Sequence, residues 1–351
     1  MPNVINVFLT LFVGLLIQNV SLEKKLKKSI FTIFVWVILT FVAGTRGLYA
    51  LGETDAYYAT YIGMMNYSLS GYLETIETDY AFYVINWAFA NIGIPWQVFL
   101  VLQSAFVLGA VSYWISKNSL NPLLSLLVFE CLFLNVWQGS LRQALGMACL
   151  LIAYELEKSK NKFLKILAIA LFIFACFCHS TAIVCILFLI LRQIPLTTGA
   201  IIAFSILTAS CYMFRNNFLA VINVFAAKLD RNTYTQFWSQ NPTTLILLCL
   251  FVLIILVFYR RILLSRFPEA KEYYPAIFLM VAMLALGGGV VVRLAWYFGI
   301  FLCLVLPVIS SIFRPQRLAN AIMIVTLLVL YLRSVDTSLW YFFWQESRNI
   351  I

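Results

Sequence analysis

Two apolar stretches joined by a charged turn, within residues 139–180, constrain the fold more than any other feature. A helix rises about 1.5 Å per residue and the hydrocarbon core of a bilayer is about 30 Å thick, so each stretch covers most of a membrane. The turn, residues 155–165, contains four lysines. Positively charged loops face the cytoplasm. The sequence therefore predicts an up-and-down helical pair that returns Arg142 and His179 together to the outer face.

The rest of the chain has the composition of a membrane protein. Hydrophobic residues make up 63% of the chain and charged residues 11%, whereas soluble domains contain about 25% charged residues. Only helices and closed barrels satisfy the backbone in lipid, and the apolar runs are too long for barrel strands. The expected fold class is an all-α polytopic membrane protein, with one membrane domain over residues 1–351.

Several classes of partner and cofactor are not expected. The net charge of +10 comes from lysines and arginines in the predicted cytoplasmic loops, and charges of the predicted outer face balance. This placement sets topology and forms no groove for a polyanion, so nucleic acid is not an expected partner. The eight cysteines lie in apolar segments without metal-type spacing. Neither a metal nor another cofactor is predicted.

Hydropathy predicts about twelve spans. Two longer outer loops are expected, at about residues 49–78 and 215–243. The apolar segment at residues 79–94 is too short to span and ends at Gly93-Ile94-Pro95. It is expected to be a re-entrant or interfacial helix.

Charged residues gather at the predicted outer ends of the spans. Charges close to lipid are costly and often mark a site. Arginine matches the oxygens of a phosphate with a planar fork of donors, and a histidine or carboxylate takes a proton from an attacking hydroxyl. The basic candidates are Arg46, Arg142, Arg293 and His179, and the acidic candidates are Glu53, Asp55 and Asp79.

Each candidate also has a structural interpretation. Arg46 would extend to lipid headgroups as readily as to a substrate. A lone histidine at a helix end, such as His179, is more often hydrogen-bonded structure than a catalyst, and Glu53 and Asp55 would also suit a solvated loop. Glu130 lies deep within a span, where an acid needs a partner or a proton, and a structural role is favoured over a proton relay.

Four segments resemble the EpsG family, the Wzy-like membrane polymerases of bacterial exopolysaccharide and O-antigen. The family pattern has an arginine followed by Gly-x-Asp and Tyr, an acid before Gly-Phe, an Arg-Gln pair on a helix, and a histidine before serine. The matching segments are TRGLYALGETDAYY (45–58), DYAFYVINWAFANIGIPWQVF (79–99), LRQALGMACLLIA (141–153) and FCHSTAIV (177–184). Two departures leave the acidic partner open: Asp79 precedes Tyr80-Ala81, and the first motif has one extra residue before Asp55.

The resemblance implies a reaction at the periplasmic face of the bacterial inner membrane. Oligosaccharide repeat units carried on undecaprenyl diphosphate would be joined, with the growing chain transferred from one lipid diphosphate to the incoming unit. A GT-C-like architecture without a metal is implied, together with a flippase and a chain-length regulator as partners. Arginines and an adjacent amide would bind the diphosphate, and a histidine or acid would deprotonate the acceptor. The first group comprises Arg142, Arg46, Arg293 and Gln143; the second comprises His179, Asp55, Asp79 and Glu53.

Other classes of membrane protein stay open at this point. A transporter, such as a flippase for lipid-linked oligosaccharide, would show duplicated halves and polar residues at the midplane. The sequence has no internal repeat, and apart from Glu130 its polar set lies at one face. A related ligase or an acyltransferase would also pair a histidine with arginines.

Overall fold

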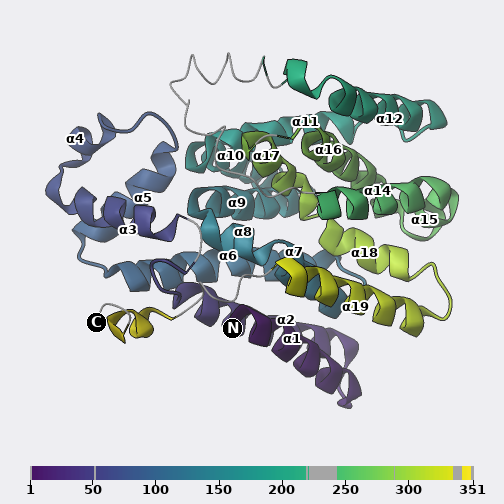
Figure 1. Ribbon diagram of the computed structural model, residues 1–351, viewed down its shortest axis with the longest axis horizontal. Coiled ribbons are helices and arrows are strands. Elements are labelled where there is room, and N and C mark those ends of the chain that lie inside the picture. The colour runs from purple at the N-terminus through teal and green to yellow at the C-terminus, as the bar shows by residue number, and fades with distance from the viewer. Residues whose placement is uncertain are drawn as a thin grey trace. The chain divides into compact units, whose positions relative to one another are not determined.

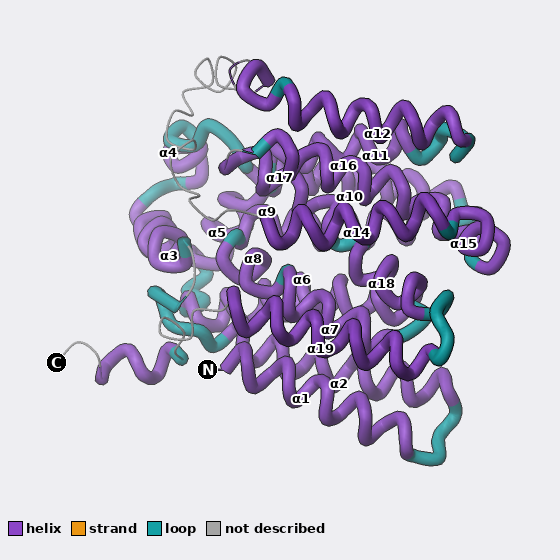
Figure 2. The backbone as a smooth tube through the Cα atoms, turned by 45° about the vertical axis from the view of Figure 1, so that its right-hand side comes forward, coloured by secondary structure: helices purple, strands orange, loops and turns teal. Residues whose placement is uncertain are grey.

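The computed structural model describes residues 2–50, 53–218, 220, 243–287, 289–334 and 342–348. Over these residues the chain is helical, and no β-strand occurs among them (Figures 1 and 2). The prediction of an all-α fold is therefore confirmed. The chain divides into two compact units, one formed by Met1–Ala182 with Ala321–Ile351 and the other by Ile183–Asn320. The single membrane domain stays a prediction.

The first unit contains long helices and, between them, the short helices of residues 54–73. Its N-terminal helices are α1 (Pro2–Asn19), α2 (Lys24–Gly44), α3 (Thr54–Gly63), η1 (Met64–Asn66), α4 (Leu69–Leu73), α5 (Tyr80–Asn91) and α6 (Trp96–Asn118). They are followed by α7 (Pro122–Leu132), α8 (Leu134–Gly139), α9 (Leu141–Glu157) and α10 (Lys162–Cys178). Most of α19 (Gln316–Ser334) and the short η5 (Phe343–Arg348) also belong to this unit.

A glycine sets the close packing of α2 against α6. A Cβ added at Gly44 would lie 2.7 Å from the Cα of Val101, so no larger residue fits there without moving the backbone. Further along the same interface, the indole nitrogen of Trp36 donates to the carbonyl of Ala105 at 2.9 Å. Helices α2 and α6 therefore pack with their backbones close together, and the indole N–H at their interface is hydrogen-bonded.

The predicted helical pair of residues 139–180 is present as α9 and α10, which lie side by side (Figure 1). The turn between them is capped by Asn161, whose side chain accepts from the backbone N–H of Phe163 at 2.9 Å. A Cβ at Gly146 would lie 3.2 Å from the carbonyl oxygen of Ala175, so a small residue is needed where the two helices approach. Their packing brings the start of α9 to the end of α10.

The segment at residues 49–78, which the sequence predicts as a loop, is instead folded into short helices. Its helices α3, η1 and α4 lie together with α5 at one end of the first unit (Figure 1). Buried aromatic residues hold them, with Tyr57, Tyr61 and Tyr72 packed into the same cluster as Phe82 and Trp96. Burial of large aromatic rings stabilises short helices that propensity alone would not.

The second unit is centred on α16 (Tyr273–Leu286), whose side chains are mostly buried. Around it lie α11 (Cys185–Leu191), α12 (Thr198–Met213), α14 (Thr243–Phe258), α15 (Arg260–Arg266), η4 (Pro268–Glu272), α17 (Gly289–Gly299) and α18 (Leu302–Ser310), after the short η2 (Ser180–Val184). The hydroxyl of Tyr274 donates to the carbonyl of Leu256 at 2.7 Å, which fixes α16 against α14. Most of the outer loop predicted at residues 215–243 lies outside the described residues.

Within the described residues, three helices are long and apolar enough to cross a membrane, and up to five if each of two bent pairs is one span. The bends are 77° after Phe258 and 50° after Gly299. Other apolar helices are shorter, so the figure of about twelve spans stays a prediction. Helix α5 has 12 residues, a length of about 18 Å. That is too short to span, in agreement with the predicted re-entrant or interfacial helix.

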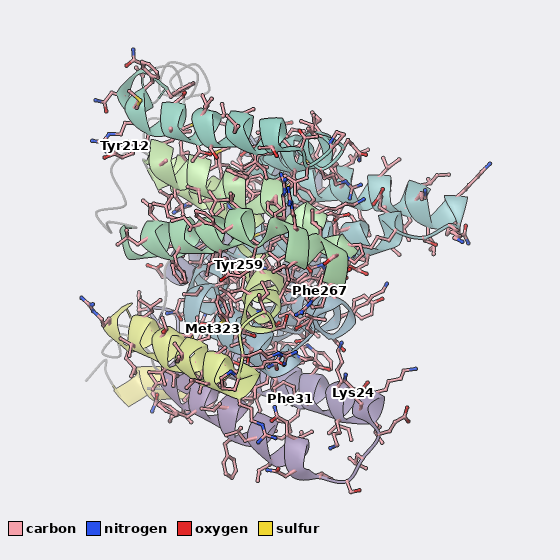
Figure 3. The ribbon with its side chains drawn as sticks, turned by 90° about the vertical axis from the view of Figure 1, so that its right-hand side faces the viewer. Lys24, Phe31, Tyr212, Tyr259, Phe267 and Met323 are labelled. Carbon is pink, nitrogen blue, oxygen red and sulfur yellow. The ribbon has the colours of Figure 1, made fainter. Side chains whose placement is uncertain are left out.

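The surfaces of the helices fit a membrane protein. Large apolar side chains such as Phe12, Ile33 and Ile166 are 57% or more exposed, as expected where lipid rather than water surrounds the chain. Figure 3 shows Lys24 at the start of α2 extending away from its helix, and Phe31, two turns later, is buried. The chain is a membrane protein.

Candidate active site

Asp79 is the centre of a hydrogen-bonded cluster in the first unit. Its Oδ2 accepts from Nη1 of Arg142 at 2.9 Å and lies 3.1 Å from Nδ1 of His179. Its Oδ1 accepts from the backbone N–H of Ser180 at 2.7 Å. One carboxylate thus joins the two residues that the sequence predicts at the outer ends of α9 and α10.

The chain positions each member at the end of a helix. Asp79 precedes α5 with φ 62°, a left-handed conformation that aspartate tolerates better than most residues. Arg142 lies in the first turn of α9, and His179 follows α10, its backbone N–H donating to Ala175 at 2.9 Å. Gly146 lies beside this histidine, since a Cβ at Gly146 would be in ordinary contact with the Cβ of His179 at 3.7 Å.

The acid is more buried than its partners. The side chain of Asp79 is 3% exposed, whereas those of Arg142 and His179 are 15% and 14% exposed. Burial alone would raise the pKa of the Asp79 carboxyl. The hydrogen bond from His179, together with its charge, the Ser180 N–H and the charge of Arg142, outweighs burial and holds that pKa below its ordinary value. Asp79 is therefore an anion at neutral pH.

Two tyrosines hold the guanidinium of Arg142. The ring centres of Tyr57 and Tyr83 lie 5.8 and 5.7 Å from its Cζ, within the range of cation–π contact. Its Nε lies 3.4 Å from the Tyr57 hydroxyl and its Nη1 lies 3.3 Å from the Tyr83 hydroxyl. Burial raises the pKa of the Tyr57 phenol to about 12, so it stays neutral. Among the described residues, Nη2 has no hydrogen-bond acceptor and keeps its donors for a ligand.

The contact with Asp79 also selects the tautomer of a neutral His179 ring. Because Nδ1 faces a carboxylate, the ring donates from Nδ1, which leaves Nε2 as the acceptor in the neutral imidazole. No described residue donates to Nε2. Within the described residues, the cluster therefore presents one ring nitrogen and one pair of guanidinium donors that have no partner.

The predicted acids of the first motif lie near this cluster in different ways. Glu53 precedes α3, and its Oε2 accepts from the hydroxyl of Tyr57 at 3.4 Å. Because the same hydroxyl lies 3.4 Å from Nε of Arg142, Glu53 is connected to Arg142 indirectly, by way of Tyr57. Asp55 is exposed in the first turn of α3 and forms no hydrogen bond or ion pair with the described residues. The structure thus brings Asp79 to Arg142 directly and leaves Asp55 outside the hydrogen-bonded set.

Arg46 lies in the interior of the same unit. It is 1% exposed, and its guanidinium donates to the carbonyls of Ala43 and Gln138 and lies 3.5 Å from the Thr54 hydroxyl. Its backbone pairs with Phe342 in an isolated bridge. Arg46 therefore connects the end of α2 to α8 and to the C-terminal segment. Its predicted contact with a diphosphate stays a prediction.

The remaining predicted residues are not part of the described hydrogen bonds around Asp79. Gln143 follows Arg142 on α9 and is 3% exposed. Arg293 lies in α17 of the second unit. Their roles in binding a diphosphate stay predictions. Tyr57 and Tyr83 were missed, because tyrosines at outer helix ends suit an aromatic belt equally well. A usable signal was the spacing of Tyr83 from Asp79, one helical turn apart.

No group of three or more His, Cys, Asp or Glu residues that could hold a metal occurs in the described parts of the chain. The described contacts of the cluster place the Arg142 guanidinium beside the His179 imidazole. The imidazole is oriented by a buried carboxylate.

These features define a helical membrane protein with an Asp-Arg-His cluster where a short helix meets the ends of a helical hairpin. The chain belongs to the EpsG family, whose sequence model matches residues 5–345. The resemblance seen in the first half of the chain is confirmed and extends over nearly all of it. Membership indicates a polymerase-like role in polysaccharide biosynthesis. No curated protein and no solved structure matches the chain.

Proposed function

We propose that the protein polymerises oligosaccharide repeat units carried on undecaprenyl diphosphate, at the periplasmic face of the bacterial inner membrane. The product is O-antigen, capsule or exopolysaccharide, and the architecture is GT-C-like with about twelve spans. The observation that carries the proposal is the single carboxylate of Asp79 shared by Arg142 and His179. The cluster combines an anion-binding group with a base, and its three residues come from three segments within the part of the chain that the family model matches.

Arg142 serves the leaving group. Departure of a lipid diphosphate develops negative charge on its bridging oxygen, and a fixed donor aimed there stabilises the transition state. The Tyr57 and Tyr83 rings and Asp79 hold the guanidinium in place before substrate arrives, while Nη2 keeps free donors. Preorganisation of this kind costs no reorientation during the reaction.

His179 serves the acceptor. Its Nε2 takes the proton from the acceptor hydroxyl as that oxygen forms a bond to the anomeric carbon of the donor sugar. The bond from that carbon to the diphosphate oxygen breaks, and undecaprenyl diphosphate leaves with the bonding electrons. Asp79 fixes the Nδ1–H tautomer and stabilises the imidazolium that forms. Asp55 and Glu53 are the alternative bases.

The other predicted ligands complete the proposal. Arg46, Arg293 and Gln143 are proposed to assist diphosphate binding, and a flippase and a chain-length regulator are proposed partners. Flippase activity is itself the second candidate function, favoured by Glu130. That acid is 1% exposed within an apolar helix, and ionisable residues at such positions often mark transport paths. It accepts from the hydroxyl of Thr10 at 2.7 Å. The hydrogen bond also suits a structural role.

Gene deletion in the host tests the proposal through the surface polysaccharide. Polymerase loss leaves a single repeat unit in place of a ladder on a gel, whereas loss of a flippase removes even the single unit. Complementation with Arg142→Ala or His179→Ala, at matched expression on a blot, is expected to leave the single unit. Lys162→Ala, at the opposite end of the hairpin, is the matched control and restores the ladder. An unchanged ladder after deletion contradicts the proposal for that glycan.

A further inference from the structure

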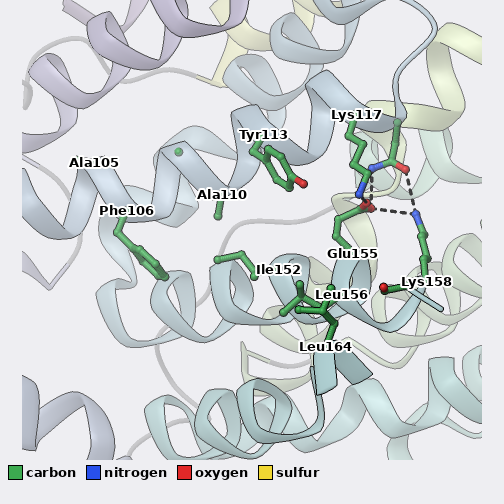
Figure 4. Close-up of a pocket in the computed structure, with 13 residues that line it drawn as sticks. Ala105, Phe106, Ala110, Tyr113, Lys117, Ile152, Glu155, Leu156, Lys158 and Leu164 are labelled. Carbon is green, nitrogen blue, oxygen red and sulfur yellow. Dashed lines mark hydrogen bonds and ion pairs between the residues drawn. The ribbon is translucent and has the colours of Figure 1, made fainter. Parts of the chain in front are cut away.

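A groove of about 1010 Å³ runs along the first unit at the lysine-bearing end of the hairpin (Figure 4). Its apolar wall combines Phe106 and Ala110 of α6 with Ile152 of α9 and Leu164 of α10. Phe106 is 44% exposed, so this wall is open to its surroundings. In a membrane such an opening faces lipid.

The polar end of the groove is built around one buried acid. The side chain of Glu155 is 2% exposed and forms ion pairs at 2.9 Å with Lys117 and with Lys158 (Figure 4). Asn118 donates to the same carboxylate at 2.7 Å. Burial would raise the pKa of the Glu155 carboxyl, but the two lysines and Asn118 outweigh it and hold the pKa below its ordinary value. Two cations and one anion leave a net charge of +1.

Both lysines keep donors for a further acceptor. An ammonium group has three N–H donors. Lys117 uses one on Glu155, and Lys158 uses one on Glu155 and one on the side-chain oxygen of Asn118 at 3.0 Å. The side chains of Lys117 and Lys158 are 48% and 36% exposed. Glu155 thus holds two ammonium groups at the groove mouth with free donors on each.

We propose that this groove binds one anionic glycerophospholipid. Its phosphate accepts from Lys117 and Lys158, and one acyl chain lies along Phe106, Ala110 and Ile152. The net positive charge favours an anionic headgroup such as phosphatidylglycerol, because the ammonium of phosphatidylethanolamine would meet the lysines. Basic pockets between membrane helices on the cytoplasmic side recognise anionic lipids in this way. The inference stands independently of the proposed polymerase reaction.

Native mass spectrometry of the purified full-length protein tests the site. The probes are phosphatidylglycerol and phosphatidylethanolamine with identical acyl chains. The wild type is expected to retain one phosphatidylglycerol under conditions that strip phosphatidylethanolamine. The double variant Lys117→Gln/Lys158→Gln is expected to bind phosphatidylglycerol about tenfold more weakly. Equal retention of the two lipids by the wild type would overturn the proposal without any variant.

Two matched variants separate this site from general surface charge. Lys162→Gln/Lys165→Gln removes the same amount of charge from two lysines close to Lys158 in sequence but outside the groove lining, and retention is expected to be unchanged. Ala105→Phe fills the apolar wall without altering charge, and retention is expected to fall for both lipids. If the Lys162/Lys165 variant loses the lipid as fully as the Lys117/Lys158 variant, the lysine turn attracts lipid as a whole and the groove assignment is wrong.

Discussion

The two ends of the α9–α10 hairpin use the same arrangement with different partners. At one end Asp79 pairs with Arg142 and His179, and at the opposite, lysine-bearing end (the lysine end) Glu155 pairs with Lys117 and Lys158. Both acids are almost fully buried. The side chains of Arg142 and His179 are 15% or less exposed, whereas those of the two lysines are 36% or more exposed.

The difference between the ends lies in what the bases can do. Arg142 is held by cation–π contacts with two tyrosine rings, and the neutral imidazole of His179 has a ring nitrogen that accepts a proton, which an ammonium group lacks. The lysines are flexible point charges that suit an anionic headgroup. A buried carboxylate with two basic partners is therefore a common scaffold, and the identity and exposure of the bases separate a site for chemistry from a site for binding.

The largest expected effect comes from Asp79→Asn. This change removes the charge that holds Arg142 and fixes the His179 tautomer, and polymerisation is expected to fall about 10³-fold or more. Glu155→Gln makes the same change at the lysine end and is expected to leave polymerisation per mole of protein within about threefold. The rate of chain growth on lipid-linked units measures both. Equal losses in the two variants would show that the acids serve only to stabilise the hairpin.

Arg142→Lys is expected to reduce polymerisation about 10²-fold, because an ammonium keeps the charge but loses the planar fork and its stacking between rings. The matched change is Lys117→Arg, which keeps charge at the lysine end and is expected to leave the rate unchanged. Turnover at saturating lipid-linked substrate is the measurement. A fully active Arg142→Lys would mean that charge alone, without fork geometry, serves the leaving group.

Gly146→Ala is expected to lower activity about fivefold, because its Cβ would press on the Ala175 carbonyl and displace His179 slightly. Gly63→Ala is the control, since a Cβ at Gly63 meets no atom within 4 Å. The ratio of the polymerisation rates of Gly146→Ala and Gly63→Ala measures the effect of crowding between α9 and α10. If both variants are as active as wild type, the position of His179 tolerates this shift.

The smallest effect is expected on stability in acid. The pKa of Asp79 is lowered in the folded protein, so its contribution to stability is complete above the ordinary value of about 3.9 and is lost as pH falls through the lower folded value. The pKa of Glu155 is also lowered in the folded protein, so its contribution to stability is likewise lost as the pH falls. Thermal unfolding in micelles between neutral pH and about pH 3 is expected to show a weaker acid dependence in Asp79→Asn than in wild type. An identical pH dependence would contradict the low pKa of Asp79.

The sequence predicts the hairpin and its ends well, because apolar length and lysine placement are local signals. It places Arg142 and His179 at one face from chain length alone. It does not select Asp79 over Asp55 and Glu53, because the deciding contacts cross 63 and 100 residues of chain. Without these tertiary contacts, the sequence gives no property that separates Asp79 from the other loop acids.

Hydropathy also misses features that depend on packing. It cannot tell an arginine that extends to headgroups from one enclosed by carbonyls, as Arg46 is. The short helices of residues 54–73 form because their tyrosines are buried in tertiary contacts, which no local pattern reports.

Reconstituted polymerisation tests the central claim most directly. Purified protein in lipid vesicles would be given an undecaprenyl-diphosphate-linked repeat unit from its own host, and both polymer length and released undecaprenyl diphosphate would be measured. We predict a ladder of products with one undecaprenyl diphosphate released per linkage formed, and loss of both with Arg142→Ala or His179→Ala. Movement of the lipid-linked unit across the vesicle membrane without any linkage formed would contradict the account and support the flippase function.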